Sequence, residues 1–168
     1  MKYDPERHHR RSTRLHGYNY SRPGAYFVTV CTHNRDLLLE SEAAQEAVIG
    51  AWQGLPTRFP AVALDEFVIM PNHVHGIVVL GDVGELEGAA SRAPTNRTRP
   101  ALGDVVLAFK SLSAIRANQI LKRTGLPFWQ RNYYERVIRD EQELGRIRQY
   151  IRDNPLRWDE DPENPSNL

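Results

Sequence analysis

The chain has 168 residues, with 22 basic and 21 acidic side chains and a formal net charge of +1. This length allows one domain whose core needs no structural metal, and the single cysteine, Cys31, cannot form an internal disulfide. No stretch is apolar and long enough to cross a membrane, and the charged start of the chain lacks the apolar core of a signal peptide. We therefore expect a cytoplasmic protein without a membrane partner.

The charge is distributed unevenly along the chain. Arginines and histidines crowd an N-terminal arm, residues 1–24, whereas acidic residues dominate a tail, residues 158–168. From Lys110 to Arg157 basic residues outnumber acidic ones, and aromatic residues are interleaved with them. Phosphate contacts and base stacking would use that mixture. A solvated charged surface over an aromatic core fits it as well.

The first predicted elements are a strand and a helix. Aromatic and β-branched residues from about Tyr26 to Thr32 predict the strand, which follows the turn signal Arg22-Pro23-Gly24. Ser41 is a suitable N-cap for a helix that runs past Trp52 and ends near Pro56.

A β-hairpin is predicted next. Two apolar runs, Val62 to Met70 and His73 to Leu80, are joined through Pro71-Asn72. Residues 81–100 are rich in Gly, Pro, Thr and Arg and carry no hydrophobic period, so we expect a mobile loop there.

The remaining elements are a helix, a strand and a last helix. An amphipathic pattern predicts a helix from Leu102 to near Gly125, and aromatic and β-branched residues predict a strand from Phe128 to Ile138. Asp140 and Glu143 resemble a capping box at the start of the last helix, which Pro155 ends at Asn154. The order of elements predicts an α+β fold of the ferredoxin-like split βαβ type over residues 25–157, an antiparallel sheet with helices on one face plus a C-terminal helix.

Two histidines interrupt the apolar inner strand of the hairpin. Side chains alternate along a strand, so His73 and His75 point the same way, roughly 7 Å apart at their backbones, while Val74 points into a core. Two neutral imidazoles can converge on one metal ion, but a third ligand must come from elsewhere. A solvent-facing pair on the sheet fits the same pattern.

Tyr150 and Asn154 lie four residues apart on the last helix, on one flank of its apolar stripe. If that helix docks beside the histidines, the amide oxygen could supply the missing ligand and the phenol a nucleophile. A tyrosine that seals the seam between helix and sheet is the alternative.

Three ordered segments carry a family resemblance: residues 70–76 (MPNHVHG), 128–135 (FWQRNYYE) and 150–155 (YIRDNP). Together they resemble the HUH single-tyrosine transposases, and more narrowly the REP-associated tyrosine transposases, which are related to insertion-sequence-200-type enzymes. The resemblance runs from about Arg10 to Pro155. The mobile-element branch has glutamine at the position of Asn154, so the Asn-Pro pair here supports the narrower assignment, although the shorter amide reaches less far.

The resemblance implies an activity and its residues. His73, His75 and Asn154 would hold one divalent cation, Mg²⁺ or Mn²⁺, and Tyr150 would cleave and rejoin single-stranded DNA through a 5′-phosphotyrosine. The implied partner is single-stranded DNA with REP-type hairpins, bound in the nucleoid by a monomer or homodimer. We expect DNA contacts from the basic arm and from basic and aromatic residues of the region 110–136: Arg10, Arg11, Arg14, Lys110, Arg116, Trp129, Arg131 and Tyr133.

Two other readings stay open at this point. A non-catalytic module could bind hairpin DNA or RNA on the same fold, although the histidine strand lacks the aromatic signature of RNA-recognition sheets. A domesticated transposase could bind hairpins without moving DNA. A histidine-triad nucleotide hydrolase is excluded, because it would need a further histidine where Ile77 stands.

Overall fold

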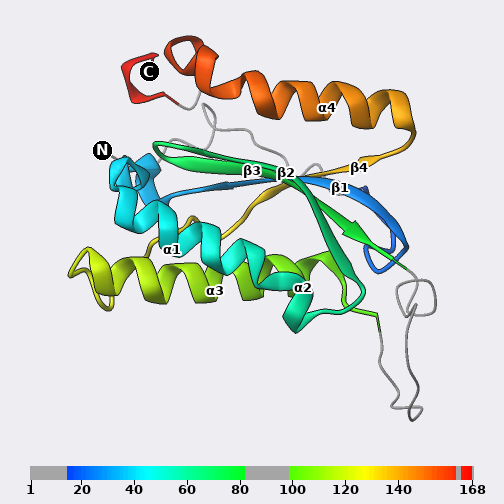
Figure 1. The fold of residues 1–168 in the computed structure, drawn as a ribbon, viewed down its shortest axis with the longest axis horizontal. Coiled ribbons are helices and arrows are strands. Elements are labelled where there is room, and N and C mark those ends of the chain that lie inside the picture. The colour runs from blue at the N-terminus through cyan, green and yellow to red at the C-terminus, as the bar shows by residue number, and fades with distance from the viewer. Residues whose placement is uncertain (1–14, 82–98, 162–163, 168) are drawn as a thin grey trace.

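The computed structural model describes residues 15–81, 99–161 and 164–167; residues 1–14 of the expected arm and 82–98 of the expected loop lie outside this range. Four strands form one antiparallel sheet in the order β2-β3-β1-β4 (Figure 1). The strands are β1 Gly24–Cys31, β2 Val62–Met70, β3 His73–Leu80 and β4 Tyr134–Ile138.

Helices cover both faces of this sheet. The α-helices are α1 Glu42–Gln53, α2 Leu55–Arg58, α3 Leu102–Ile120 and α4 Glu141–Asp153. Figure 1 shows α1 and α3 on one face and α4 on the opposite face. This arrangement confirms the predicted split βαβ fold with an additional C-terminal helix.

Side chains cap two of the helices as the sequence predicts. The Ser41 hydroxyl accepts a hydrogen bond from the Ala44 amide at the start of α1. At the start of α4 the Asp140 carboxylate accepts from the Glu143 amide over 2.7 Å, and Glu143 accepts from the Arg139 amide over 2.9 Å. These bonds satisfy amides that have no partner within the helix, which fixes where each helix begins.

Two predicted boundaries are wrong. The helix α3 ends at Ile120 instead of near Gly125, because the chain turns at Lys122, which has a φ of 55°. The strand β4 begins at Tyr134 instead of Phe128. Phe128 and Trp129 are buried in the core and share only one isolated bridge with the sheet, so their apolar character reflects packing and not strand pairing.

The main core lies between the sheet, α1 and α3. Trp52 stacks on Phe67 with a centroid distance of 4.5 Å and meets the edge of Phe109. Gly76 in β3 faces these rings, and a Cβ at this position would lie 2.6 Å from the Trp52 indole. The backbone of the histidine strand therefore approaches the aromatic core closely.

A smaller apolar cluster lies on the other face, beneath α4. Its buried members are Phe27, Ile77, Ile138 and Ile151. The histidine side chains open onto this face, where Tyr150 of α4 contacts His75, and Trp158 in the segment after α4 contacts His73. Within the described residues, no helix combines the length and apolar character needed to span a membrane.

Candidate active site

The alternation of β3 places His73 and His75 on the face that α4 covers. Both imidazoles are buried, and Val74 between them packs into the main core on the other face. Their Nε2 atoms lie 3.1 Å apart. The two imidazoles therefore lie on the same side of the strand, as expected, and they are buried instead of solvent-facing.

Hydrogen bonds at the Nδ1 atoms hold the two rings in place. Nδ1 of His73 lies 2.9 Å from Oδ1 of Asn72, whose Nδ2 donates to the carbonyl of Arg35, so Oδ1 is the acceptor. Nδ1 of His75 lies 2.8 Å from the Thr29 hydroxyl on the neighbouring strand. A proton on Nδ1 leaves the Nε2 lone pair available, which is the state in which imidazole binds metal.

The surroundings keep His75 neutral. Its pKa is lowered to about 3, first by burial and second by the charge of His73. A neutral ring does not need to lose a proton before it binds a cation. A neutral His75 is thus better suited to bind a cation than to act as an acid.

Tyr150 reaches this pair from α4. Its hydroxyl lies 3.5 Å from Nε2 of His75, and its ring packs against the rings of His75 and Phe27 at centroid distances of 5.3 and 6.0 Å. The side chain is 46% exposed, so one side of the phenol faces the histidines while the other is open to solvent. A large substrate could reach this phenol without unfolding the protein.

The pKa of Tyr150 is raised above its usual value. Burial is the main cause, and the charge of Asp161 adds to it, while a hydrogen bond with the Asn154 side chain acts in the opposite direction. The phenol is therefore protonated at neutral pH, and its proton must leave when the oxygen acts as a nucleophile.

Asn154 follows α4 directly and is buried at the start of the 3-10 helix Asn154–Glu160. Its Oδ1 has no hydrogen-bond partner among the described residues. A buried acceptor without a partner is costly, and a cation would satisfy it. Two nitrogens that bind one ion at about 2.1 Å and at right angles lie about 3.0 Å apart, so the spacing of the histidine Nε2 atoms fits such an ion as well.

The acidic segment after α4 contributes a residue that the sequence patterns did not identify. Asp161 is buried, and its Oδ2 lies 3.8 Å from Nε2 of His73. The described residues hold no group of three or more His, Cys, Asp and Glu side chains arranged for a metal. A third donor for a cation would therefore have to be another kind of group, and the buried amide oxygen of Asn154 is a candidate.

The positioning residues Thr29 and Asn72 were also missed. Asn72 precedes the first histidine and could be suspected from its place in the motif, but Thr29 is 46 residues away in the chain and meets His75 only through the pairing of β1 with β3. No local pattern predicts a role for Asp161, because a run of acidic residues usually indicates a solvated tail.

The residues expected to contact DNA are scattered. Arg10, Arg11 and Arg14 lie outside the described residues. Arg116 and Arg131 are exposed, and Tyr133 is half-buried. Arg116 belongs to α3, on the opposite face of the sheet from Tyr150 (Figure 1). A DNA strand could reach both only by passing around the sheet.

Two of these residues have structural partners instead. The ammonium group of Lys110 donates to the carbonyls of Gln130 and Arg131, and burial lowers its pKa. Trp129 is buried, and its indole nitrogen donates to Ser113 over 2.9 Å. Base stacking needs an exposed ring face, which Trp129 does not offer in this structure.

No protein-family model matches the chain. An uncharacterized protein from Haemophilus influenzae is 37% identical to it over 178 aligned positions, which cover 95% of this chain and 96% of that protein.

Solved structures of other proteins share the fold. The structure of a REP-associated tyrosine transposase bound to a REP hairpin matches with a TM-score of 0.58 and 20% identity, over 83% of this chain and 71% of that chain. A crystal structure from Deinococcus radiodurans, of a protein proposed to be a transposase, matches with a TM-score of 0.50 and 21% identity, over 82% of this chain and 95% of that chain.

Proposed function

We propose that this chain, which belongs to one family with the Haemophilus influenzae protein and has the fold of the REP-associated tyrosine transposase, is a DNA transposase of the single-tyrosine type. Its activity would be to cleave and rejoin single-stranded DNA. The observation that carries the proposal is the position of the Tyr150 hydroxyl, 3.5 Å from a buried, neutral imidazole and still accessible to solvent.

The proposed reaction exchanges one phosphoester bond for another. The Tyr150 oxygen forms a bond to the phosphorus of a DNA phosphodiester, and the bond from that phosphorus to the 3′-oxygen breaks. The phenolic proton leaves the tyrosine, and the departing 3′-oxygen takes up a proton to become a hydroxyl. The covalent 5′-phosphotyrosine keeps the ester bond energy, so the reverse reaction with a 3′-hydroxyl rejoins DNA without a nucleotide cofactor.

We also propose that the site takes one divalent cation, Mg²⁺ or Mn²⁺, held by His73, His75 and Asn154. Bound there, a cation supplies positive charge that offsets the charge developing on the phosphate oxygens. Asn72 and Thr29 would orient the two rings, and the unpartnered Oδ1 of Asn154 supports its role as the third donor. The charge of Asp161 next to His73 would favour a cation in this site over an anion.

The substrate we propose is single-stranded DNA that carries a REP-type hairpin. The transposase with the same fold was solved bound to a REP hairpin. In this chain the exposed Arg131 could contact a phosphate, and the exposed Arg116 could do so if the strand passes around the sheet. Tyr150 and the histidines of one chain lie together, which supports cleavage by a monomer, and a homodimer is the alternative.

A nicking assay tests the nucleophile. A single-stranded hairpin oligonucleotide with Mg²⁺ or Mn²⁺ should be cleaved by the wild type, whereas Tyr150→Phe should reduce cleavage to background and leave binding unchanged. Tyr134→Phe is the matched control, because Tyr134 lies in the same small cluster and should be dispensable. Cleavage by Tyr150→Phe would overturn the assignment, and hairpin binding without cleavage by the wild type would favour the non-catalytic module.

Calorimetry tests the cation independently of cleavage. We expect Mn²⁺ to bind the wild type with one-to-one stoichiometry and Asn154→Ala to bind it about 10-fold or more weakly. Asn132→Ala, which changes an exposed asparagine, is the control and should bind as the wild type does. Equal affinity of the Asn154 variant would remove this residue from the set of ligands.

A further inference from the structure

The helix that carries Tyr150 is held to the sheet by few apolar side chains. In α4 only Ile151 is a buried hydrophobic residue, and Leu144 and Ile147 are half-buried beside it. Such a narrow stripe resists removal of the helix from the sheet, but it opposes rotation of the helix about its own axis only weakly. Something else must set the direction in which Tyr150 points.

A β-bulge in β2 lies opposite one flank of this helix. Leu64 pairs with Val78 and Phe67 with Gly76, so two residues of β2, Asp65 and Glu66, face a single residue of β3. Consecutive side chains of a regular strand point to opposite faces of the sheet. The bulge breaks that alternation, and both carboxylates reach α4.

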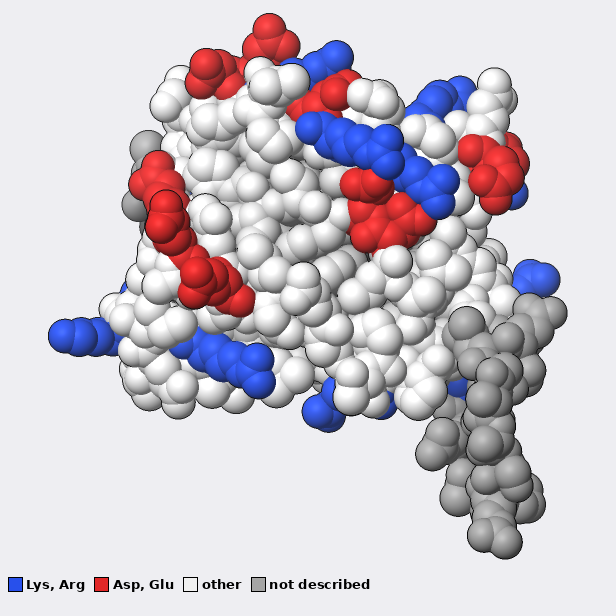
Figure 2. Space-filling model, in the orientation of Figure 1, with Lys and Arg blue, Asp and Glu red and all other residues white. Residues whose placement is uncertain are grey.

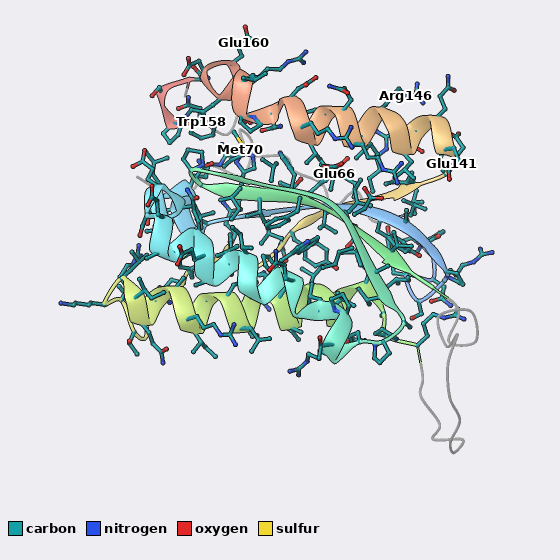
Figure 3. All side chains as sticks on the ribbon, viewed as in Figure 1. Glu66, Met70, Glu141, Arg146, Trp158 and Glu160 are labelled. Atoms are coloured by element: carbon teal, nitrogen blue, oxygen red, sulfur yellow. The ribbon has the colours of Figure 1, made fainter. Side chains whose placement is uncertain are left out.

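Each carboxylate pairs with one arginine of α4. Nε and Nη2 of Arg148 donate to the two oxygens of Asp65 over 3.0 and 2.6 Å. One helical turn further, Nε of Arg152 donates to Oε1 of Glu66 over 2.9 Å, and its Nη2 donates to the same oxygen. We call these four residues the bulge clamp. Figure 3 shows Glu66 between α4 and the sheet, and Figure 2 shows basic and acidic groups side by side in this region.

The clamp differs from an ordinary surface ion pair in two respects. The fork of the Arg148 guanidinium matches the Asp65 carboxylate, which fixes direction as well as distance. The carboxylates are mostly covered, with side-chain exposures of 19% for Asp65 and 27% for Glu66. The hydrogen bond from Arg148 is the largest influence on the pKa of Asp65 and holds it below its usual value, so this carboxylate is charged at neutral pH.

The clamp and Tyr150 lie on opposite flanks of α4. Two residues along a helix correspond to about 200° around its axis, so Tyr150 leaves the helix away from the Arg148 flank. The arginines reach outward to the edge strand β2, while Tyr150 packs on Phe27 of β1 and next to His75 of β3. A rotation that broke the clamp would therefore move the phenol relative to the histidines.

We infer that Asp65, Glu66, Arg148 and Arg152 are positioning residues that set the rotation of α4 and so hold the Tyr150 hydroxyl at the histidine pair. This inference rests on the proposed function, because it gives the clamp a purpose only if Tyr150 is the nucleophile. The four residues touch neither the phenol nor the histidines in the contacts described above, so they act through the helix.

The test is a double-mutant cycle with two readouts. The variants are Asp65→Ala, Arg148→Ala and the double variant, and Arg146→Ala is the matched control. Arg146 is exposed on the side of α4 away from the sheet (Figure 3). The first readout is the rate of covalent adduct formation with a single-stranded hairpin. The second is hydrogen exchange of the amides in residues 141–153, which reports helix docking without DNA or metal.

We expect each single variant to slow adduct formation about 10- to 100-fold, with hairpin affinity changed less than about 3-fold. The double variant should be no slower than the slower single variant, because the two residues act as a unit. Exchange in α4 should accelerate about 10-fold in all three variants, because a helix that can turn on the sheet is held less firmly, and a 13-residue helix is only marginally stable in water by itself. Arg146→Ala should change neither readout.

The outcomes separate the two proposals. If the wild type forms no adduct but exchange in α4 of the variants accelerates as expected, the proposed function is wrong, and the inference that the clamp positions α4 still holds. If the wild type forms the adduct and the Asp65 and Arg148 variants match it in adduct rate and in amide exchange, the inference that the clamp positions α4 is wrong. Should Arg148→Ala fail to fold, Arg148→Lys keeps the charge and removes the fork, and an adduct rate equal to that of the wild type in this variant would also overturn the inference.

Discussion

The two faces of the sheet carry different kinds of side chains. On the α1 and α3 face, stacked aromatic rings and aliphatic side chains form the main core. On the α4 face, a cluster of four buried apolar residues shares the space with two histidines, an asparagine and an aspartate. Burial of apolar surface is the dominant source of stability, so one face mainly stabilises the fold and the other presents polar groups.

This division explains how a single strand serves both purposes. Val74, Gly76 and Val78 of β3 face the main core, while His73 and His75 face α4. The strand packs closely against the aromatic side, and hydrogen bonds with Thr29 and Asn72 hold the imidazoles on its other side. Changes on the two faces should therefore produce separable losses of stability and of chemistry.

The largest expected effect on stability comes from the main core. Phe109→Ala should lower the free energy of unfolding by about 3–5 kcal/mol, because it leaves a cavity among Trp52, Phe67 and Trp129. Ile151→Ala on the α4 face should cost about 2 kcal/mol, because fewer apolar neighbours surround it. Urea unfolding measures both values. Equal losses would contradict the proposed difference between the faces.

A smaller loss of stability is expected when an extra methyl group is forced into the main core on the α1 and α3 face. Gly76→Ala should lower the free energy of unfolding by about 1–3 kcal/mol, since the new Cβ meets the Trp52 ring at 2.6 Å. Binding of Mn²⁺ to the folded variant should be unchanged, because the methyl group points away from the histidines. A variant that also carries Trp52→Leu should recover part of the loss in urea unfolding. If the Gly76→Ala protein is as stable as the wild type, the main core is not packed as tightly around β3 as we infer.

The smallest expected change in stability comes from the α4 face. Thr29→Val keeps the shape of the side chain and removes the hydroxyl that holds Nδ1 of His75. We expect Mn²⁺ affinity to fall about 10- to 100-fold by calorimetry, with the free energy of unfolding changed by about 1 kcal/mol. If Mn²⁺ affinity stays the same, the hydrogen bond does not orient a ligand.

Local signals in the sequence predicted most of the fold. The strands β2 and β3 and the caps at Ser41 and Asp140 depend on residues close together in the chain, and the structure confirms them. The start of β4 was misjudged, because Phe128 and Trp129 are as apolar as strand residues, and only tertiary packing directs them into the core.

The residues of the candidate active site could be predicted only where they lie within a sequence motif. His73, His75, Tyr150 and Asn154 lie in segments that resemble a known family, and the structure brings them together; their roles remain proposals. The bulge at Asp65 depends on strand register, which no local pattern in these residues indicates. Residues contributed by long-range pairing, such as Thr29, could be found only from the fold.

The most direct test of the central claim is to identify the residue that becomes linked to DNA. After reaction with a single-stranded hairpin and Mn²⁺, the protein is digested with protease and nuclease, and the modified peptide is sequenced by mass spectrometry. The account predicts a nucleotide on Tyr150 and on no other tyrosine. A nucleotide on Tyr134 or another residue, or folded protein that binds the hairpin and carries no nucleotide, would contradict it.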